Sequence, residues 1–288
     1  MHQRLAHRTV PGLARPMAAL ALVLLLAGCG GGSKSAAPPG PPPTVSQLYN
    51  NGVDALNARR FSTASDQFEQ VEQNFPYSPW ATHALLMQAY TAYLQNHYTS
   101  AVGTLNRYIQ LHPTASDIAY AYYLRALCYY EQIGDIQRDQ KDTQIAMGAL
   151  QEVVNRYPDT PYATDARLKI DLCRDHLAGH EMEIGRWYEG QHLYEAAIGR
   201  FQRVVNDYQT TNHVPEALHR LVEIYMILGL KQEALRTAAV LGYNYPGSSW
   251  YALSYNDLAE HGLVKDASGK PLPAPSGGFF SRVWSSVF

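Results

Sequence analysis

One pattern of apolar residues recurs five times along this chain and constrains its fold more than any other feature. Each copy has an alanine, an apolar residue four positions later and another three positions after that, and three copies end in an aromatic residue followed by proline. The five alanines are Ala64, Ala101, Ala146, Ala197 and Ala234. Spacings of four and three residues place side chains on one face of an α-helix, and proline cannot continue that helix. Each copy therefore predicts one amphipathic helix with a defined end.

A partner helix is expected before each copy, because the preceding segments also show helical periodicity. Small residues in these first helices would let the alanine of the second helix approach closely; they are Gly52, Ala89, Ala126 and Gly185. Repeated antiparallel helix pairs stack into a solenoid, in which each pair buries its apolar face against its neighbours. The pattern resembles the tetratricopeptide repeat. We therefore predict an all-α fold, an α-solenoid of five such helix pairs over residues 44–258.

Two of the five copies carry insertions. The steps between successive alanines are 37, 45, 51 and 37 residues. We assign the shorter insertion to a polar loop at residues 134–142. The longer one adds about four helical turns and predicts an elongated helix over residues 161–190. An additional short helix is the alternative, because Gly179 lies near the middle of that segment.

Residues 1–28 are typical of an export signal. Their only charged residues are Arg4, Arg8 and Arg15, and residues 17–27 are an apolar stretch. The sequence Leu-Ala-Gly-Cys at 26–29 is similar to a bacterial lipobox, so we expect cleavage before Cys29 and lipid attachment to it. An ordinary signal peptide with an incidental cysteine is the alternative.

The lipid would anchor the protein in a membrane by burying acyl methylene groups. Residue 30 is glycine and not the aspartate that retains lipoproteins in the inner membrane, so we expect an outer-membrane protein facing the periplasm of a Gram-negative bacterium. Residues 29–43 are rich in glycine, serine and proline, which predicts a flexible, disordered tether.

Residues 259–288 form a C-terminal linker and tail. The linker is rich in glycine and proline, and the apolar residues of 279–288 recur with helical spacing. This spacing predicts a short amphipathic helix that docks on a membrane surface or a partner. A disordered tail is the alternative.

Composition and motifs argue against several functions. Beyond residue 28 the chain carries 20 basic and 25 acidic side chains, unlike the basic surface of a nucleic-acid-binding protein. No nucleophile motif, phosphate-binding loop or carboxylate pair points to catalysis, so we expect no enzyme and no cofactor. His176 and His180 lie four residues apart, but Ile184 stands where the zinc-protease spacing needs a histidine, so we predict no metal site.

Cys128 and Cys173 occupy equivalent positions in neighbouring repeats. Packed helices lie about 8–10 Å apart, which is too far for a disulfide. We expect two buried free thiols.

Tyrosines gather on the first helices of the first three pairs. In tetratricopeptide repeats one stripe of each first helix faces a concave groove, and tyrosine there can stack on apolar side chains and donate hydrogen bonds to a peptide backbone. The predicted groove residues are Tyr49, His83, Tyr90, Tyr93, Tyr120, Tyr123 and Tyr130. The alternative is that these side chains only pack one first helix against the next.

The signal, the tether and the repeats together resemble the BamD family of lipoproteins of the outer-membrane β-barrel assembly machinery. The most specific segments are YPDTPYATDA at 157–166, LAGHE at 177–181 and the Trp-Tyr pair at 187–188. The resemblance covers roughly residues 26–258. The tail beyond 264 goes past the shorter members of the family.

The resemblance implies a scaffold without enzymatic activity. Its N-terminal repeats would receive the C-terminal segment of unfolded outer-membrane proteins, and its C-terminal repeats would hold the periplasmic POTRA region of a BamA-like barrel, beside other lipoproteins of the complex. Arg200 aligns with the arginine-bearing stretch that faces this partner. We expect Arg200 and Arg203 on the exposed side of their helix, where both would contact the partner. A merely solvated face is the alternative for these arginines.

Two other functions stay open from the sequence alone. One is another periplasmic tetratricopeptide adaptor, acting in cell division or polysaccharide export. The other is an envelope hydrolase that uses the histidine pair.

Overall fold

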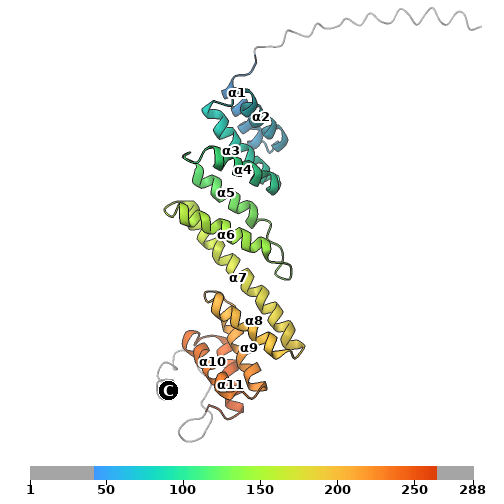
Figure 1. Cartoon of the computed structure of the whole chain (residues 1–288), viewed down its shortest axis with the longest axis vertical. Helices are drawn as coiled ribbons and strands as arrows, with labels where there is room; N and C mark the ends of the chain where they lie inside the picture. The colour runs from blue at the N-terminus through green and yellow to red at the C-terminus, as the bar shows by residue number, and fades with distance from the viewer. Residues whose placement is uncertain (1–41, 265–288) are drawn as a thin grey trace, which may run out of the picture. The chain divides into compact units, whose positions relative to one another are not determined.

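The computed structural model describes residues 42–264, which form eleven α-helices and no strand (Figure 1). The helices are α1 (Val45–Asn57), α2 (Phe61–Asn74), α3 (Pro79–Leu94), α4 (Tyr98–Leu111), α5 (Ile118–Tyr130), α6 (Lys141–Arg156), α7 (Pro161–Gly190), α8 (Tyr194–Asp207), α9 (Val214–Ile227), α10 (Lys231–Asn244) and α11 (Ser249–Glu260). Each helix packs against the next, and α11 packs against both α9 and α10. The five helix pairs of the predicted α-solenoid are confirmed, and α11 follows the fifth pair.

Local backbone features mark where helices begin. The second helix of four pairs follows a tight turn containing one residue with positive φ, namely Arg59, Asn96, His192 or Gly229. The third pair lacks this turn and has a longer loop at residues 131–140. Helices α3 and α7 begin with proline, after Ser78 and Thr160, whose hydroxyls each accept a backbone hydrogen bond at 3.2 Å.

The five repeated alanines form the centre of the solenoid, and each is 0% exposed. The predicted role of Gly52 and Gly185 needs a correction. The phenyl rings of Phe68 and Phe201, not the alanines, lie against these two glycines, and a Cβ on Gly185 would come within 2.5 Å of the Phe201 ring. The glycines are therefore small because a ring from the second helix fills the space that their side chains would take.

The longer insertion is one continuous helix. Helix α7 runs from Pro161 to Gly190, so the elongated helix is confirmed and the additional short helix is wrong. Gly179 does not interrupt it. A Cβ at Gly179 would lie 3.3 Å from Nε2 of His213 and 3.8 Å from the side chain of Ile136, so this glycine permits a close approach of two other elements. The shorter insertion is the loop at 131–140, slightly earlier than predicted, because α6 already begins at Lys141.

Cys128 and Cys173 are buried free thiols in one hydrophobic cluster, as predicted. None of the helices in residues 42–264 is long and apolar enough to cross a membrane. The predicted signal peptide, the lipid site Cys29, most of the tether and the tail from 265 lie outside the described residues.

Candidate functional site

The predicted groove residues lie on the first helices of the first three pairs, α1, α3 and α5. All six tyrosines are half-buried, whereas His83 is exposed and approaches Asp117 at 3.5 Å. Each ring therefore packs on the protein with part of its surface and leaves part of it accessible. Packing between first helices and an accessible aromatic surface occur together at these positions.

One group of contacts joins α5 to α7. Tyr120 and Tyr123 both pack on Tyr162, with ring centroids 5.5 Å and 5.3 Å apart, and the second pair is stacked. The Tyr123 hydroxyl donates a hydrogen bond to Oδ2 of Asp165 at 2.5 Å. Tyr162 and Asp165 are not among the predicted groove residues, because they lie in the first turns of α7 and only the packing of α5 on α7 brings them to this surface.

A second group of contacts joins α3 to its neighbours. The Tyr93 hydroxyl donates to Oε1 of Glu131 at 3.3 Å, and the Tyr93 ring lies 5.8 Å from that of Tyr98. Burial and the nearby Glu131 carboxylate raise the pKa of Tyr93 to about 12. Its hydroxyl is therefore protonated at every physiological pH, and its single proton is donated to Glu131.

Two of the predicted tyrosines, Tyr49 and Tyr130, make contacts of their own. Tyr49 packs at 5.6 Å on Phe68 and at 4.9 Å on Trp80, within the first pair and the helix that follows it. Tyr130 lies at the end of α5, where the Lys169 ammonium is 5.3 Å from its ring centre. Tyr130 also lines an open pocket of about 280 Å³ with Leu172. Tyr130 is thus linked through Lys169 to the Asp165 carboxylate that Tyr123 contacts, whereas Tyr49 packs within the first pair and on α3.

Arg200 and Arg203, the two arginines predicted on the exposed side of α8, both pair with a glutamate of α7. Arg200 Nη1 donates to Oε2 of Glu181 at 2.9 Å, and Arg203 Nη1 donates to Oε1 of the same carboxylate at 2.8 Å. Glu181 lies on α7 and only 11% of its side chain is exposed, against 30% for Arg200 and 48% for Arg203. Both guanidinium groups therefore compensate a buried charge, and the hydrogen bond from Arg200 also raises its own pKa.

The histidine pair singled out in the sequence does not gather metal ligands in the described part of the chain. His180 Nδ1 contacts the backbone carbonyl of Ile136, in the loop between α5 and α6. The Nε2 atom of His176 is buried and has no hydrogen-bond partner within residues 42–264. The loop and the long helix α7 are thus held together by His180.

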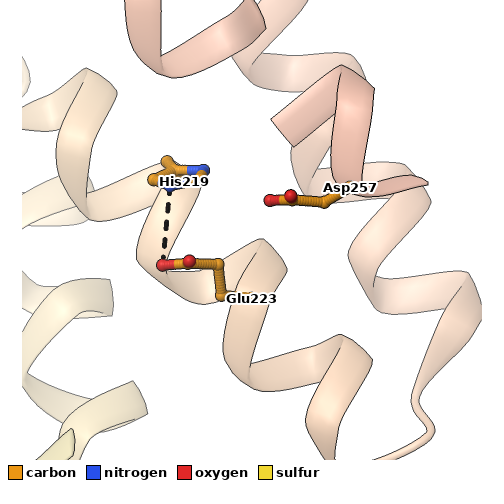
Figure 2. A group of neighbouring side chains, drawn as sticks. All are labelled: His219, Glu223 and Asp257. Atoms are coloured by element: carbon orange, nitrogen blue, oxygen red, sulfur yellow. Dashed lines mark ion pairs between the residues drawn. The ribbon is translucent and has the colours of Figure 1, made fainter. Parts of the chain in front are cut away.

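A different histidine lies beside two carboxylates. His219 and Glu223 are one helical turn apart on α9, and Asp257 faces them from α11 (Figure 2). One potential ligand atom from each residue lies within 4.8 Å of the others. The sequence contains the signal of a histidine and a glutamate four positions apart, but α11 and its Asp257 join them only through tertiary packing.

Comparisons with known proteins place these surfaces in context. Residues 42–241 match the family model YfiO, described as an outer membrane lipoprotein. The outer membrane protein assembly factor BamD of Caulobacter vibrioides is 49% identical over 254 residues, which are 86% of this chain and 83% of that protein. The BamD of Rickettsia prowazekii is 45% identical, over 83% of this chain and 94% of that protein.

A solved structure gives a more distant match. A thermophilic TPR protein of Thermus thermophilus is 18% identical, covers 74% of this chain and 98% of its own, and has a TM-score of 0.35.

Proposed function

The chain belongs to the outer membrane lipoprotein family of the BamD assembly factors, and on that premise we propose that it is a non-enzymatic lipoprotein scaffold of the outer-membrane β-barrel assembly complex. Its role in outer membrane protein assembly follows from 49% identity that extends over most of both chains. The finer proposal is that it receives unfolded outer-membrane proteins on its first three helix pairs and docks on a BamA-like barrel with its last two.

The accessible tyrosines on α3 and α5 carry the proposal that these pairs receive unfolded protein. Rings held half-buried by their neighbours lose little further side-chain entropy when a peptide binds. Their exposed faces can stack on aromatic and apolar side chains, and a hydroxyl oxygen can accept a hydrogen bond from a peptide N–H. This chemistry suits an extended segment ending in an aromatic residue, which is the C-terminal signal implied for the clients.

The binding test uses a synthetic peptide with a C-terminal phenylalanine and the double variant Tyr90→Ala with Tyr93→Ala. Tyr123 is left intact because its hydroxyl joins α5 to α7. Each lost ring contact is worth about 1–2 kcal/mol, so the affinity is expected to fall more than tenfold. Tyr77 is wholly exposed in the turn before α3, and Tyr77→Ala is the matched control. An unchanged affinity of the folded double variant would remove these tyrosines from the proposal.

The proposed docking surface for the BamA-like partner lies on the fourth and fifth pairs. Apolar side chains are exposed at the turns that join the two helices of each pair. At the α7–α8 turn Trp187 is 60% and Leu193 is 51% exposed. At the α9–α10 turn Ile227 is 60% and Leu230 is 46% exposed. Exposed apolar groups of this size favour burial against another protein. Arg203 keeps nearly half of its side chain exposed and could add a polar contact beside its pair with Glu181.

Copurification from membranes tests the docking proposal. The variant Trp187→Ser with Ile227→Ser is expected to reduce the amount of a BamA-like barrel recovered with this protein. Leu111→Ser is the matched control, because Leu111 is 59% exposed but lies at the end of α4 in the second pair. Equal recovery of the barrel with both variants would show that docking lies elsewhere.

A further inference from the structure

We propose that His219, Glu223 and Asp257 bind a zinc ion that ties α9 to α11. The proposal is independent of the proposed scaffold function, because it concerns the three side chains shown in Figure 2 and none of the tyrosines or exposed apolar turns. Zinc in proteins takes imidazole nitrogen and carboxylate oxygen as ligands, commonly in a tetrahedral arrangement. Three protein ligands and one water molecule would complete the coordination here.

The hydrogen bonding of His219 favours a metal ligand at Nε2. Nδ1 lies 2.8 Å from the hydroxyl oxygen of Ser254, on α11. When Nδ1–H donates to that hydroxyl, the lone pair of the neutral imidazole lies on Nε2. Metal-bound histidines are held in their ligating form by this kind of second contact. The side chain is only 5% exposed, so its orientation is fixed by the surrounding protein.

Nε2 and the Glu223 carboxylate are separated as two ligands of one metal ion would be, and they are too far apart for a good hydrogen bond. Oε2 of Glu223 lies 3.5 Å from Nε2. Zinc–ligand bonds of about 2.0–2.2 Å in a tetrahedral site put neighbouring ligand atoms about 3.3–3.6 Å apart. Asp257 offers an oxygen within 4.8 Å of both other ligand atoms, so a small side-chain rotation would bring it to coordinating distance.

The surrounding charges also favour a cation. The connected group of α7, α9 and α11 contains five carboxylates and two guanidinium groups: Glu183, Glu189, Glu216, Glu223 and Asp257 against Arg186 and Arg220. Arg220 lies within 4 Å of Glu189, Glu216 and Glu223, at 3.8, 3.7 and 3.2 Å, so it keeps two acidic partners if the metal takes Glu223. A divalent cation would neutralise part of the excess negative charge.

Asp257 fits the role of the third ligand. Within residues 42–264 its carboxylate has no hydrogen bond and no ion pair at contact distance, although it is half-buried. A bound metal would provide the partner that this carboxylate lacks. It would also attach α11, the last helix described, to the fifth helix pair.

Zinc binding is tested with the whole protein, purified without a polyhistidine tag and stripped with a chelator. After dialysis against limiting ZnCl₂, mass spectrometry is expected to find one zinc per chain. A zinc concentration well above the dissociation constant is expected to raise the thermal unfolding midpoint by about 5 °C. Asp257→Asn and Glu223→Gln should each weaken zinc binding at least tenfold and abolish most of this shift.

Glu233→Gln is the matched control. Glu233 is an exposed carboxylate on α10 that pairs with Arg236, and its loss should leave zinc binding unchanged. The metal-free ligand variants should unfold close to the metal-free wild type, because Asn and Gln keep the shape of the side chains they replace. The proposal is overturned if the wild type binds no zinc above background. It is also overturned if both ligand variants retain wild-type zinc content, because the metal would then be bound elsewhere.

Discussion

The Tyr123 hydroxyl on α5 donates a 2.5 Å hydrogen bond to the Asp165 carboxylate on α7. Tyr162 stacks on the Tyr123 ring beside this bond, so one side chain of the third pair contacts two residues of the fourth. The bond lowers the pKa of Asp165, and Lys169 adds to the effect by pairing with the same oxygen at 3.2 Å. The charged form of Asp165 is thus favoured in the folded protein.

Tyr123→Phe is expected to lower the free energy of unfolding by about 1 kcal/mol. Hydrogen bonds to charged groups contribute about 1.5–3 kcal/mol when buried, and partial exposure of Asp165 reduces that contribution. Chemical denaturation at pH 7 measures the loss. Tyr77→Phe is the control, because Tyr77 is wholly exposed.

The same variant predicts a pH dependence. The pKa of Asp165 in the folded protein is lower than its ordinary value of 3.8 in the unfolded chain. The stabilisation from the bond is therefore fully present above about pH 5 and is lost as the pH falls through the lowered pKa. The difference in stability between the wild type and Tyr123→Phe should be constant from pH 5 to 8 and should shrink towards pH 3. A difference that grows on acidification would contradict the assigned role of Asp165.

Removing both arginines that pair with Glu181 is expected to destabilise the protein. The variant Arg200→Ala with Arg203→Ala leaves a carboxylate that is 11% exposed without a cation. The expected loss is about 2–3 kcal/mol, less than for a fully buried pair, because both guanidinium groups are partly solvated. Urea unfolding measures it.

Two further variants separate this effect from a general loss of arginine. Arg236→Ala removes an arginine that pairs with an exposed glutamate on α10, and should cost less than about 0.5 kcal/mol. Adding Glu181→Met to the double arginine variant should recover most of the lost stability, because the unpaired charge is then absent. A double variant as stable as the wild type would mean that water already compensates Glu181.

Gly185→Ala and Gly199→Ala should change stability in opposite directions. A Cβ at Gly185 would meet the Phe201 ring at 2.5 Å, and relieving such a clash costs about 1–3 kcal/mol. Gly199 lies inside α8 with no atom within 4 Å of its added Cβ, so alanine there should stabilise by up to about 1 kcal/mol. Thermal unfolding midpoints of the two variants test both predictions. Equal effects would show that helix propensity alone decides them.

Cys29→Ala is expected to release the protein from the membrane fraction or to leave an unprocessed precursor. The reason is the Leu-Ala-Gly-Cys sequence after an apolar run too short to span a bilayer. Ser33→Ala, four residues later, is the control. Membrane fractionation and the apparent mass of the product distinguish the outcomes, and wild-type processing and fractionation of Cys29→Ala would refute lipid anchoring there.

The helical repeat could be predicted because its cause is local. Apolar spacing and proline after the second helix act within about one helical turn, so the five pairs and the long helix α7 follow from residue order. The same local signals identified the tyrosines of α3 and α5 as surface candidates, since side chains three and four residues apart share a helix face.

Contacts between helices were decided only by the tertiary structure. The periodicity of their helix predicts that Arg200 and Arg203 are exposed, yet both donate hydrogen bonds to the Glu181 carboxylate of the neighbouring α7. Likewise Asp257 joins His219 only because α11 packs against α9. Periodicity states which face of a helix is apolar but carries no information on which polar side chain of another helix will meet it. That pairing depends on the offset and crossing of the packed helices, which the sequence specifies only through the whole core.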